Sequence, residues 1–388
     1  MVQKKTLEER LLLSMSGDEA QALVRQASDP LLSWYRENAR DLPWRHKATA
    51  YRVWISEVML QQTRVEAVKP YYARFLEAFP DLPALARAEE ERLLKCWEGL
   101  GYYSRARNLQ KAARQVMEQF GGELPASYEA LLSLPGFGEY TAGAVASIAY
   151  GIRVPAVDGN GIRVFSRLLA SEADGMNAGV RKSYRELLLS VMPPEEPGTY
   201  NQAVMELGAT LCGPGGAPRC GECPLNALCR GYQGGNPTAF PVKAPKKPRR
   251  IEERTIFLLV CPDGVILQKR PKGLLGGLWE FPGEEGRLSF KEQGALLKER
   301  GVEYETLSLL PEAKHIFSHV EWHMTGCLAV CSNVPPKEGQ VLARWEELES
   351  RYPLPGAFSA YRRVLEEKRK DEEDGRSIFK GGPGGDPE

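Results

Sequence analysis

The segment 134–142, with the sequence Leu-Pro-Gly-Phe-Gly-Glu-Tyr-Thr-Ala, places Gly136 and Gly138 directly before a run of small residues. Glycine permits positive φ and leaves backbone N–H groups uncovered, so a phosphate can approach such a tight turn closely. The small residues of 139–150 predict a helix, whose N-terminal dipole adds to the attraction for an anion. The pattern indicates either a hairpin that binds DNA without reading its sequence or an ordinary turn between helices.

The length of the chain and its balance of charges limit the number of domains and the way in which it could bind nucleic acid. A chain of 388 residues with 43% hydrophobic content is too long for one compact core, and we expect two domains. Lys plus Arg and Asp plus Glu both number 51, so any affinity for nucleic acid must come from local patches. One candidate is 101–114, with four basic residues, no acid, and Tyr102 and Tyr103 to stack on bases; the alternative is a solvated helix face.

The sequence shows no secretion signal and no membrane segment. The first ten residues are charged, no long apolar stretch follows them, and no run of 18 apolar residues occurs. We therefore expect a soluble, cytoplasmic protein, in which eight cysteines do not form a disulfide framework.

Composition divides the chain into five segments. The 1–24 stretch is charged with little periodicity, and 371–388 is acidic and then rich in Gly and Pro, so both are expected to be flexible tails. Apolar residues recur at three and four positions within 25–235, which predicts an all-α domain. A basic, Pro-rich linker follows at 236–250, and short β-branched runs within 251–370 predict a small α+β domain.

The same periodicities locate the expected elements. Helices are expected at 51–68, 71–79, 89–100, 106–120, 128–134, 139–150, 162–169, 181–191 and 201–211. In the second domain, strands are expected at 255–261, 265–269 and 325–331, with a helix at 290–300.

Four of the cysteines are clustered. Their spacing is Cys-x7-Cys-x2-Cys-x5-Cys, and they follow the last helix of the all-α domain: Cys212, Cys220, Cys223 and Cys229. Four thiolates brought together in a reducing compartment nearly always hold a metal, and both zinc and a 4Fe–4S cluster accept four sulfurs. Zinc ribbons usually have two Cys-x-x-Cys pairs, whereas this chain has one pair with wide flanks.

The hairpin, the turn Val-Asp-Gly-Asn at 157–160 and the cysteine quartet together resemble the helix-hairpin-helix DNA glycosylases of the endonuclease III superfamily, over roughly 30–230. The resemblance implies that the loop 212–229 holds a structural 4Fe–4S cluster, although the family usually has six residues between its first two cysteines and this loop has seven. Members that also cut the DNA backbone carry a Schiff-base lysine where this chain has Tyr140, so the resemblance implies simple hydrolysis.

Three strings, 42–45, 54–63 and 99–105, resemble the signatures of MutY-type adenine DNA glycosylases. This resemblance implies that Glu57 is the general acid that protonates an extruded adenine. A helix-surface carboxylate is the alternative for Glu57, but its apolar neighbours predict burial, which raises a carboxyl pKa toward neutrality.

The resemblance also assigns Asp158 a role. It implies an ionised Asp158 that stabilises the positive charge developing on the sugar, as in retaining glycosidases. Asp158 also directly precedes an expected helix, which predicts an N-cap, and the two roles are compatible. Tyr140 and Asn160 are expected to complete the hydrogen bonding around the two carboxylates.

DNA contacts are expected elsewhere in the chain, because the target adenine must first leave the duplex. Gln62 and Tyr102 match family residues that fill or wedge the gap, and the glycines of the hairpin are expected to hold the backbone. Residues 251–370 resemble the Nudix-like domain that MutY-type enzymes use to recognise 8-oxoguanine, without the Nudix metal-binding box. Its expected contact loop is Phe317, Ser318 and His319.

Taken together, the resemblance implies a multidomain enzyme of base-excision repair, an all-α helix-hairpin-helix domain followed by a small α+β Nudix-like domain. Its partner would be double-stranded DNA with adenine opposite 8-oxoguanine or guanine, bound by a monomer associated with a bacterial nucleoid. Three alternatives stay open: an endonuclease III-like glycosylase for damaged pyrimidines, a non-catalytic iron–sulfur DNA-binding protein that senses redox state, and a zinc-stabilised DNA-binding module. Tyr140 and the second domain oppose the first of these.

Overall fold

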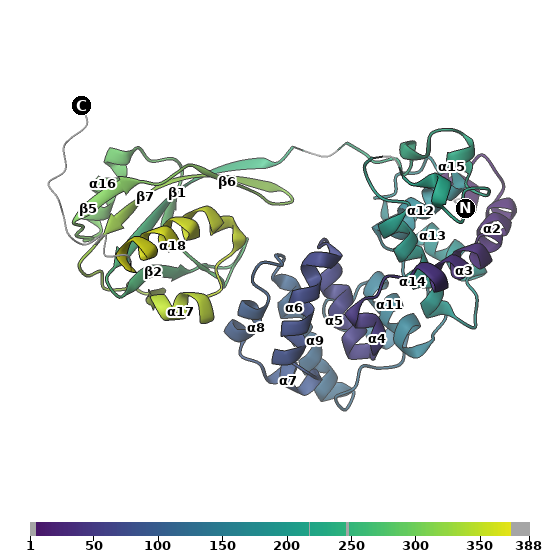
Figure 1. Cartoon of the computed structure of the whole chain (residues 1–388), viewed down its shortest axis with the longest axis horizontal. Helices are drawn as coiled ribbons and strands as arrows, with labels where there is room; N and C mark the ends of the chain where they lie inside the picture. Colours follow the sequence, from purple (N-terminus) through teal and green to yellow (C-terminus); the bar gives the residue numbers. More distant parts are fainter. Residues whose placement is uncertain (1–4, 217, 246–247, 374–388) are drawn as a thin grey trace. The chain divides into compact units, whose positions relative to one another are not determined.

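The computed structural model describes residues 5–216, 218–245 and 248–373. The chain divides into two compact units (Figure 1), of which the first comprises Met1–Ala88 and Arg107–Lys246 and the second Glu89–Ala106 and Lys247–Glu388. The expected fold class is confirmed, because the first unit is helical and the second contains a sheet packed with helices. The segment 89–106, which we expected in the helical domain, belongs to the second unit.

The first unit is built from α-helices joined by short turns. They are α1 (Leu7–Leu11), α2 (Gly17–Gln26), α3 (Ser28–Asn38), α4 (Pro43–His46), α5 (Ala50–Leu60), α6 (Val65–Ala78), α7 (Leu82–Arg87), α9 (Ser104–Gln119, shared with the second unit), α10 (Tyr128–Leu132), α11 (Glu139–Tyr150), α12 (Gly159–Leu169), α13 (Ala178–Val191), α14 (Pro197–Thr210) and α15 (Arg230–Gln233), with 3₁₀ turns at Cys220–Glu222 and Pro237–Ala239.

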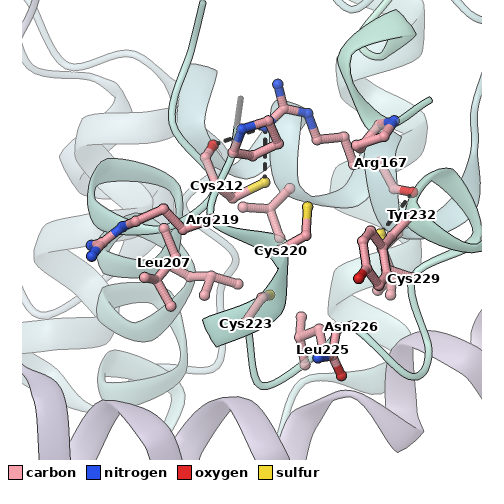
Figure 2. Close-up of a pocket in the computed structure, with 15 residues that line it drawn as sticks. Arg167, Leu207, Cys212, Arg219, Cys220, Cys223, Leu225, Asn226, Cys229 and Tyr232 are labelled. Carbon is pink, nitrogen blue, oxygen red and sulfur yellow. Dashed lines mark hydrogen bonds between the residues drawn. The ribbon is translucent and has the colours of Figure 1, made fainter. Parts of the chain in front are cut away.

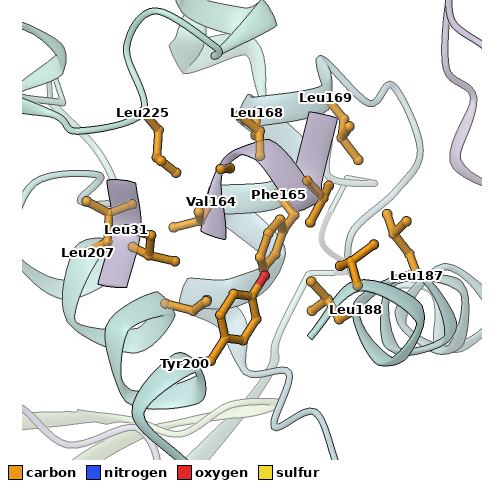
Figure 3. Close-up of a cluster of buried hydrophobic side chains, with 14 of the residues drawn as sticks. Leu31, Val164, Phe165, Leu168, Leu169, Leu187, Leu188, Tyr200, Leu207 and Leu225 are labelled. Atoms are coloured by element: carbon orange, nitrogen blue, oxygen red, sulfur yellow. The ribbon is translucent and has the colours of Figure 1, made fainter. Parts of the chain in front are cut away.

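Helix α12 runs through the core of this unit, and every residue from Gly161 to Leu169 is buried. Figure 3 shows the apolar side chains of α12 surrounded by Leu31 of α3, Leu188 of α13 and Leu207 of α14. Each fully buried side chain of this size contributes roughly 1.5–3 kcal/mol. The packing therefore fixes α12, and with it the turn at its N-terminus.

The expected N-terminal tail is wrong for the described residues, because α1 and α2 lie within it. Thr6 and Ser16 each form a capping box with a glutamate three residues later, Glu9 and Glu19. These Thr-x-x-Glu and Ser-x-x-Glu patterns are helix-start signals that the periodicity analysis missed. Leu11 then anchors the segment in the core. Residues 1–4 lie outside the described residues.

The expected helix at 51–68 is two helices. Helix α5 ends at Leu60, and Gln62 adopts a positive φ of 58°, which breaks the helix before α6 begins at Val65. Pro70, expected to separate two helices, lies inside α6. The other expected helices are confirmed with shifted ends, and α11 has the expected bounds.

In the second unit an eight-stranded sheet is described, with the main order β3-β2-β1-β7-β5; in addition β4 pairs with β1, β6 with β7 and β8 with β2. Strands β1 and β7 pair in parallel, and the other pairs are antiparallel. The elements are α8 (Glu90–Cys96), β1 (Arg250–Cys261), β2 (Gly264–Lys269), β3 (Trp279–Glu280), β4 (Gly283–Glu285), α16 (Phe290–Glu299), β5 (Thr306–Leu309), β6 (Ala313–Ile316), β7 (Val320–Val330), β8 (Gln340–Arg344), α17 (Trp345–Ser350), a 3₁₀ turn (Gly356–Phe358) and α18 (Ser359–Glu373).

Both faces of this sheet are covered, which explains the uninterrupted apolar run in β1. Ile256 and Leu258 pack on one face with side chains of α17 and α18, and Phe257 packs on the other with Leu297 of α16. Residues 374–388 of the expected C-terminal tail lie outside the described residues, and α18 extends to Glu373. Throughout the described ranges, every helix is too short or too polar to cross a bilayer.

Candidate active site

Glu57 lies in α5 and is 6% exposed. It is the single acidic residue of a helix that is otherwise mostly apolar, so the fold encloses its carboxyl group. Trp54, one turn earlier, stacks on Phe137 of the hairpin with ring centroids 5.2 Å apart, which holds α5 against the hairpin. The burial expected from the neighbours of Glu57 is confirmed, and a position on the helix surface is excluded.

Tyr140, in the first turn of α11, donates a hydrogen bond from its phenol to Oε2 of Glu57. Burial raises the pKa of Glu57 to about 7; the Tyr140 hydrogen bond acts against this rise, and the charge of Asp158 adds to it. Burial and the two carboxylates also hold the pKa of Tyr140 well above its usual value. At neutral pH Tyr140 is therefore a permanent O–H donor, and Glu57 is divided between its protonated and ionised forms.

Asp158 is the N-cap of α12, as expected. Its Oδ1 accepts from the Gly161 backbone N–H at 2.8 Å, and its Oδ2 accepts from Nδ2 of Asn160 at 2.7 Å. Burial raises the pKa of Asp158, while these two donors and the charge of Arg163 oppose the rise. The two carboxyl groups thus differ in their hydrogen-bond donors: Glu57 accepts from a phenol, and Asp158 accepts from two N–H groups.

Arg163 connects this turn to the cysteine loop. Its Nη2 donates to Oδ1 of Asn160 and to the carbonyl oxygen of Gly208, both at 2.7 Å, and its Nε donates to the carbonyl oxygen of Cys212 at 2.7 Å. Because Oδ1 of Asn160 accepts from a guanidinium, its Nδ2 is oriented toward Asp158. The orientation of the Asp158 carboxylate therefore depends on the cysteine loop.

All four clustered cysteines line one pocket (Figure 2). Arg167 donates to Sγ of Cys212 at 3.2 Å, and the Cys229 thiol donates to the Arg167 carbonyl oxygen at 3.3 Å. Burial raises the pKa of Cys223 to about 12, and the charges of the other three thiols add to this. Among the described residues, no three His, Cys, Asp or Glu side chains already surround a single metal-ion position. Ala217 of this loop lies outside them.

The hairpin glycines differ in conformation. Gly136 has φ +78°, and a Cβ there would lie 2.7 Å from Cβ of Asn108, so only glycine fits. Gly138 has φ −91°, a value open to any residue, and is the N-cap of α11. No side chain caps that helix, so the backbone N–H groups of its first turn remain available to an anion.

Gln62 and Tyr102 both adopt positive φ, 58° and 48°, and both are exposed. A left-handed conformation costs a residue with a side chain roughly 1–2 kcal/mol. Strain of this kind persists where the surrounding structure imposes it, and it is common at functional sites.

The expected basic patch at 101–114 is partly wrong. Arg105 is 9% exposed, and its Nη2 donates to the carbonyl oxygens of Leu100 and Gly101 at 3.0 and 3.1 Å. Tyr103 is 5% exposed, whereas Tyr102 is 47% exposed. The buried Arg105 and Tyr103 side chains shape this turn, and Tyr102 is the tyrosine of the pair that is exposed to solvent.

Phe317, Ser318 and His319 form the turn between β6 and β7. The Phe317 ring packs edge-on against Trp322 with centroids 4.9 Å apart, and the carbonyl oxygen of His319 accepts from the Arg250 backbone N–H at 3.1 Å. The turn is thereby anchored, while the side chains of Ser318 and His319 are exposed.

Glu206 on α14 is a further buried acid, 1% exposed, that the sequence patterns did not single out. It accepts from Nε of Arg40 at 2.6 Å and from Nη2 of Arg45 at 2.8 Å, and the charge of Arg45 in turn lowers the pKa of Glu57. The family resemblance identified Glu57, whereas the signal that could have identified Glu206 is its position as the single acid of α14.

Two further α14 residues support the Asp158 turn. Asn201 accepts from the Ala156 backbone N–H at 3.0 Å and donates to the Val154 carbonyl oxygen at 2.9 Å, which fixes the segment before Asp158. At Gly208 a Cβ would lie 2.5 Å from Cβ of Asn160. Glycine at this position lets α14 approach the turn.

Two family models match this chain. The profile described as "HhH-GPD superfamily base excision DNA repair protein" matches residues 55–188, and that of the NUDIX domain matches 255–364. A solved structure of a thermostable thymine-DNA glycosylase is 28% identical, with a TM-score of 0.50 over 56% of this chain and 98% of that one.

Two curated relatives extend across both units. The adenine DNA glycosylase of Rattus norvegicus is 38% identical over 88% of this chain and 78% of its own length. That of Buchnera aphidicola subsp. Baizongia pistaciae is 32% identical over 78% of this chain and 87% of its own length. The chain therefore belongs to the adenine DNA glycosylase family.

Proposed function

We propose that the protein hydrolyses the N-glycosidic bond of adenine paired with 8-oxoguanine or guanine in DNA, the first step of base-excision repair. The name of its relatives supports adenine as the substrate. The observation that carries the proposal is the buried Glu57 with a pKa of about 7, which accepts from Tyr140 and is influenced by the charge of Asp158.

In this proposal protonated Glu57 transfers its proton to N7 of the extruded adenine. The C1′–N9 bond then breaks, and its electron pair leaves with the base. A general acid works best when its pKa is close to the operating pH, and the pKa of Glu57 meets this condition. The Tyr140 hydroxyl holds the carboxyl group in one orientation throughout.

Asp158 acts on the sugar. As an ionised carboxylate oriented by Asn160 and the Gly161 N–H, it stabilises the positive charge that develops at C1′. Water then bonds to C1′ and its proton returns to Glu57, so that free adenine and an abasic site are the products. Position 140 offers a phenol in place of an amine, so no Schiff base forms and the strand stays intact.

We further propose that Cys212, Cys220, Cys223 and Cys229 hold a 4Fe–4S cluster. Four thiols line one pocket, and Arg167 places a positive charge beside Cys212, which suits an anionic thiolate site. The single Cys-x-x-Cys pair with wide flanks favours a 4Fe–4S cluster over a zinc ribbon, which usually has two such pairs. Bound there, the cluster would brace the loop structurally, because glycosidic hydrolysis transfers no electrons.

We assign the DNA contacts to both units. The backbone N–H groups of the 136–139 turn bind a phosphate, and Gln62 and Tyr102 fill the space that the adenine leaves. The exposed side chains of Ser318 and His319 contact the base opposite adenine.

The test is a duplex with one adenine opposite 8-oxoguanine, incubated with protein and then treated with alkali to cleave abasic sites. We expect cleavage only after alkali, and no covalent adduct when borohydride is present. Glu57→Gln should lower the single-turnover rate by about a thousandfold, whereas Glu66→Gln, a change at an exposed ion pair on α6, should not. Cleavage without alkali, with borohydride trapping, would instead support the endonuclease III-like alternative.

A further inference from the structure

We propose that Lys95 and Glu98 clamp the Tyr102 turn to the C-terminal domain and thereby couple recognition of the base opposite adenine to insertion of Tyr102 into DNA. The inference rests on the proposed function and adds two positioning residues to it. It starts from the division of the chain, in which the segment 89–106 belongs to the same compact unit as the C-terminal domain.

Lys95 matches its three N–H donors to three acceptors. Its Nζ donates to the carbonyl oxygens of Leu348 and Tyr352, both at 3.2 Å, and pairs with Oε2 of Glu98 at 2.6 Å. Leu348 lies near the C-terminal end of α17, where carbonyl groups lack partners within the helix and attract a cation. The Lys95 side chain is 16% exposed, so solvent competes weakly for these contacts.

Glu98 uses both of its carboxylate oxygens. Oε2 faces Lys95, and Oε1 accepts from Nη1 of Arg362 on α18 at 2.7 Å. The Glu98 side chain is 14% exposed, so this three-residue network is screened less than an ion pair on the surface. The segment 95–98 is thus attached to both α17 and α18 of the C-terminal domain.

Tyr102, the residue proposed to insert into DNA, lies shortly after the clamp residues Lys95 and Glu98 in the chain. Between Glu98 and Tyr102 the chain turns sharply, with positive φ at Gly99, Gly101 and Tyr102. The carbonyl oxygen of Gly101 accepts from Nε1 of Trp97 and from Nη2 of Arg105, both at 3.1 Å. Because its backbone is held in this way, the turn that carries Tyr102 moves together with Lys95 and Glu98.

The loop 317–319 belongs to the same unit, on the sheet that α17 and α18 cover. When this loop contacts the opposite base, the clamp presents Tyr102 to the duplex in a fixed relation to the domain. Binding free energy gained when the loop 317–319 contacts an oxidised base then also favours insertion of Tyr102. If Tyr102 were not attached to the C-terminal domain, this energy could not contribute to its insertion.

The test uses Lys95→Met and Glu98→Gln in the full chain. The matched control is Glu91→Gln, which removes an exposed ion pair to Lys269 at 3.3 Å from the same segment. A duplex carries 2-aminopurine beside the base opposite adenine, and its fluorescence rises when Tyr102 unstacks it. Tyr102→Ala defines the signal without a wedge. Adenine release is measured in parallel opposite 8-oxoguanine and opposite guanine.

We expect both clamp variants to lose most of the fluorescence rise, and the rate ratio between 8-oxoguanine and guanine to fall about tenfold, while Glu91→Gln changes each by less than about twofold. Full fluorescence and an unchanged ratio in both clamp variants would overturn the inference. If either variant fails to fold, Arg362→Gln tests the same network from α18. Absence of adenine release by the unmodified protein would refute the proposed function instead, and the fluorescence would still decide the clamp.

Discussion

The phenol of Tyr140 donates to the carboxyl group of Glu57 across 83 positions of sequence. The same carboxyl group is buried and lies under the influence of Asp158. Three side chains from α5, α11 and the N-cap of α12 therefore set one pKa near neutrality, which is the electrostatic condition for an acid that works at pH 7.

Replacing Tyr140 by Phe should move the alkaline limb of the pH–rate profile to higher pH. The Tyr140 hydrogen bond lowers the pKa of Glu57, so its loss raises that pKa above about 7 and keeps the acid protonated at higher pH. The rate at the optimum should fall about tenfold, because the carboxyl group loses its orientation. Single-turnover adenine release measured from pH 5.5 to 9 tests this; an alkaline limb that stays in place or moves down contradicts it.

Glu57→Gln should stabilise the fold at high pH while it lowers the rate of adenine release about a thousandfold. The pKa of Glu57 is raised from 4.5 to about 7, so the protonated form is favoured in the folded state. This favourable contribution is complete below pH 4.5 and is lost as the pH rises toward 7, at a cost of about 3 kcal/mol above that.

Urea unfolding at pH 5 and pH 8 measures this effect. Glutamine does not ionise, so the variant should gain on the unmodified protein at pH 8 and much less at pH 5. Equal stability differences at the two pH values would show that Glu57 is not the group responsible.

Gly208→Ala should impair the Asp158 turn. The added methyl group would lie 2.5 Å from Cβ of Asn160, displacing the amide that donates to Asp158. Overpacking of this kind costs about 1–3 kcal/mol, and we expect at least about a tenfold loss of rate from the misplaced carboxylate.

Gly161→Ala is the matched control. Its Cβ would lie 3.5 Å from Val204 and 3.6 Å from Asp158, which is ordinary contact, and alanine favours the helix by about 0.5–1 kcal/mol. Thermal unfolding and single-turnover rates should therefore separate the two variants. A Gly208→Ala protein as active as Gly161→Ala would show that α14 does not position Asn160.

Cys223→Ser should remove the proposed cluster. The purified protein should lose its brown colour and its iron, and its unfolding temperature should fall, because the loop loses its bracing. Cys96→Ser, outside the pocket, should keep both colour and iron. Zinc in place of iron in the unmodified protein would exclude the cluster, and an unchanged iron content in Cys223→Ser would exclude that cysteine as a ligand.

Local signals in the sequence predicted a large part of the fold. The small residues after Gly138 gave the bounds of α11, and the β-branched runs after residue 250 located β1, β2 and β7. The missed α1 and α2 also have local signals, the capping boxes at Thr6 and Ser16. In α2 the buried residues Ala20, Leu23 and Val24 also recur at helical spacing, so this signal was present in a segment read only for its charge.

The sequence by itself determined which groups the chain brings to the site: an acid in an apolar helix, a capping aspartate, a phenol in place of a lysine, and four clustered cysteines. Only the tertiary structure decided that Tyr140 meets Glu57, that Arg163 ties Asn160 to the cysteine loop, and that 89–106 joins the C-terminal domain. Sequence patterns report burial and backbone preference, which are local properties. A pKa or a hydrogen-bond partner depends on which distant helices pack together, and that packing exists only in the folded chain.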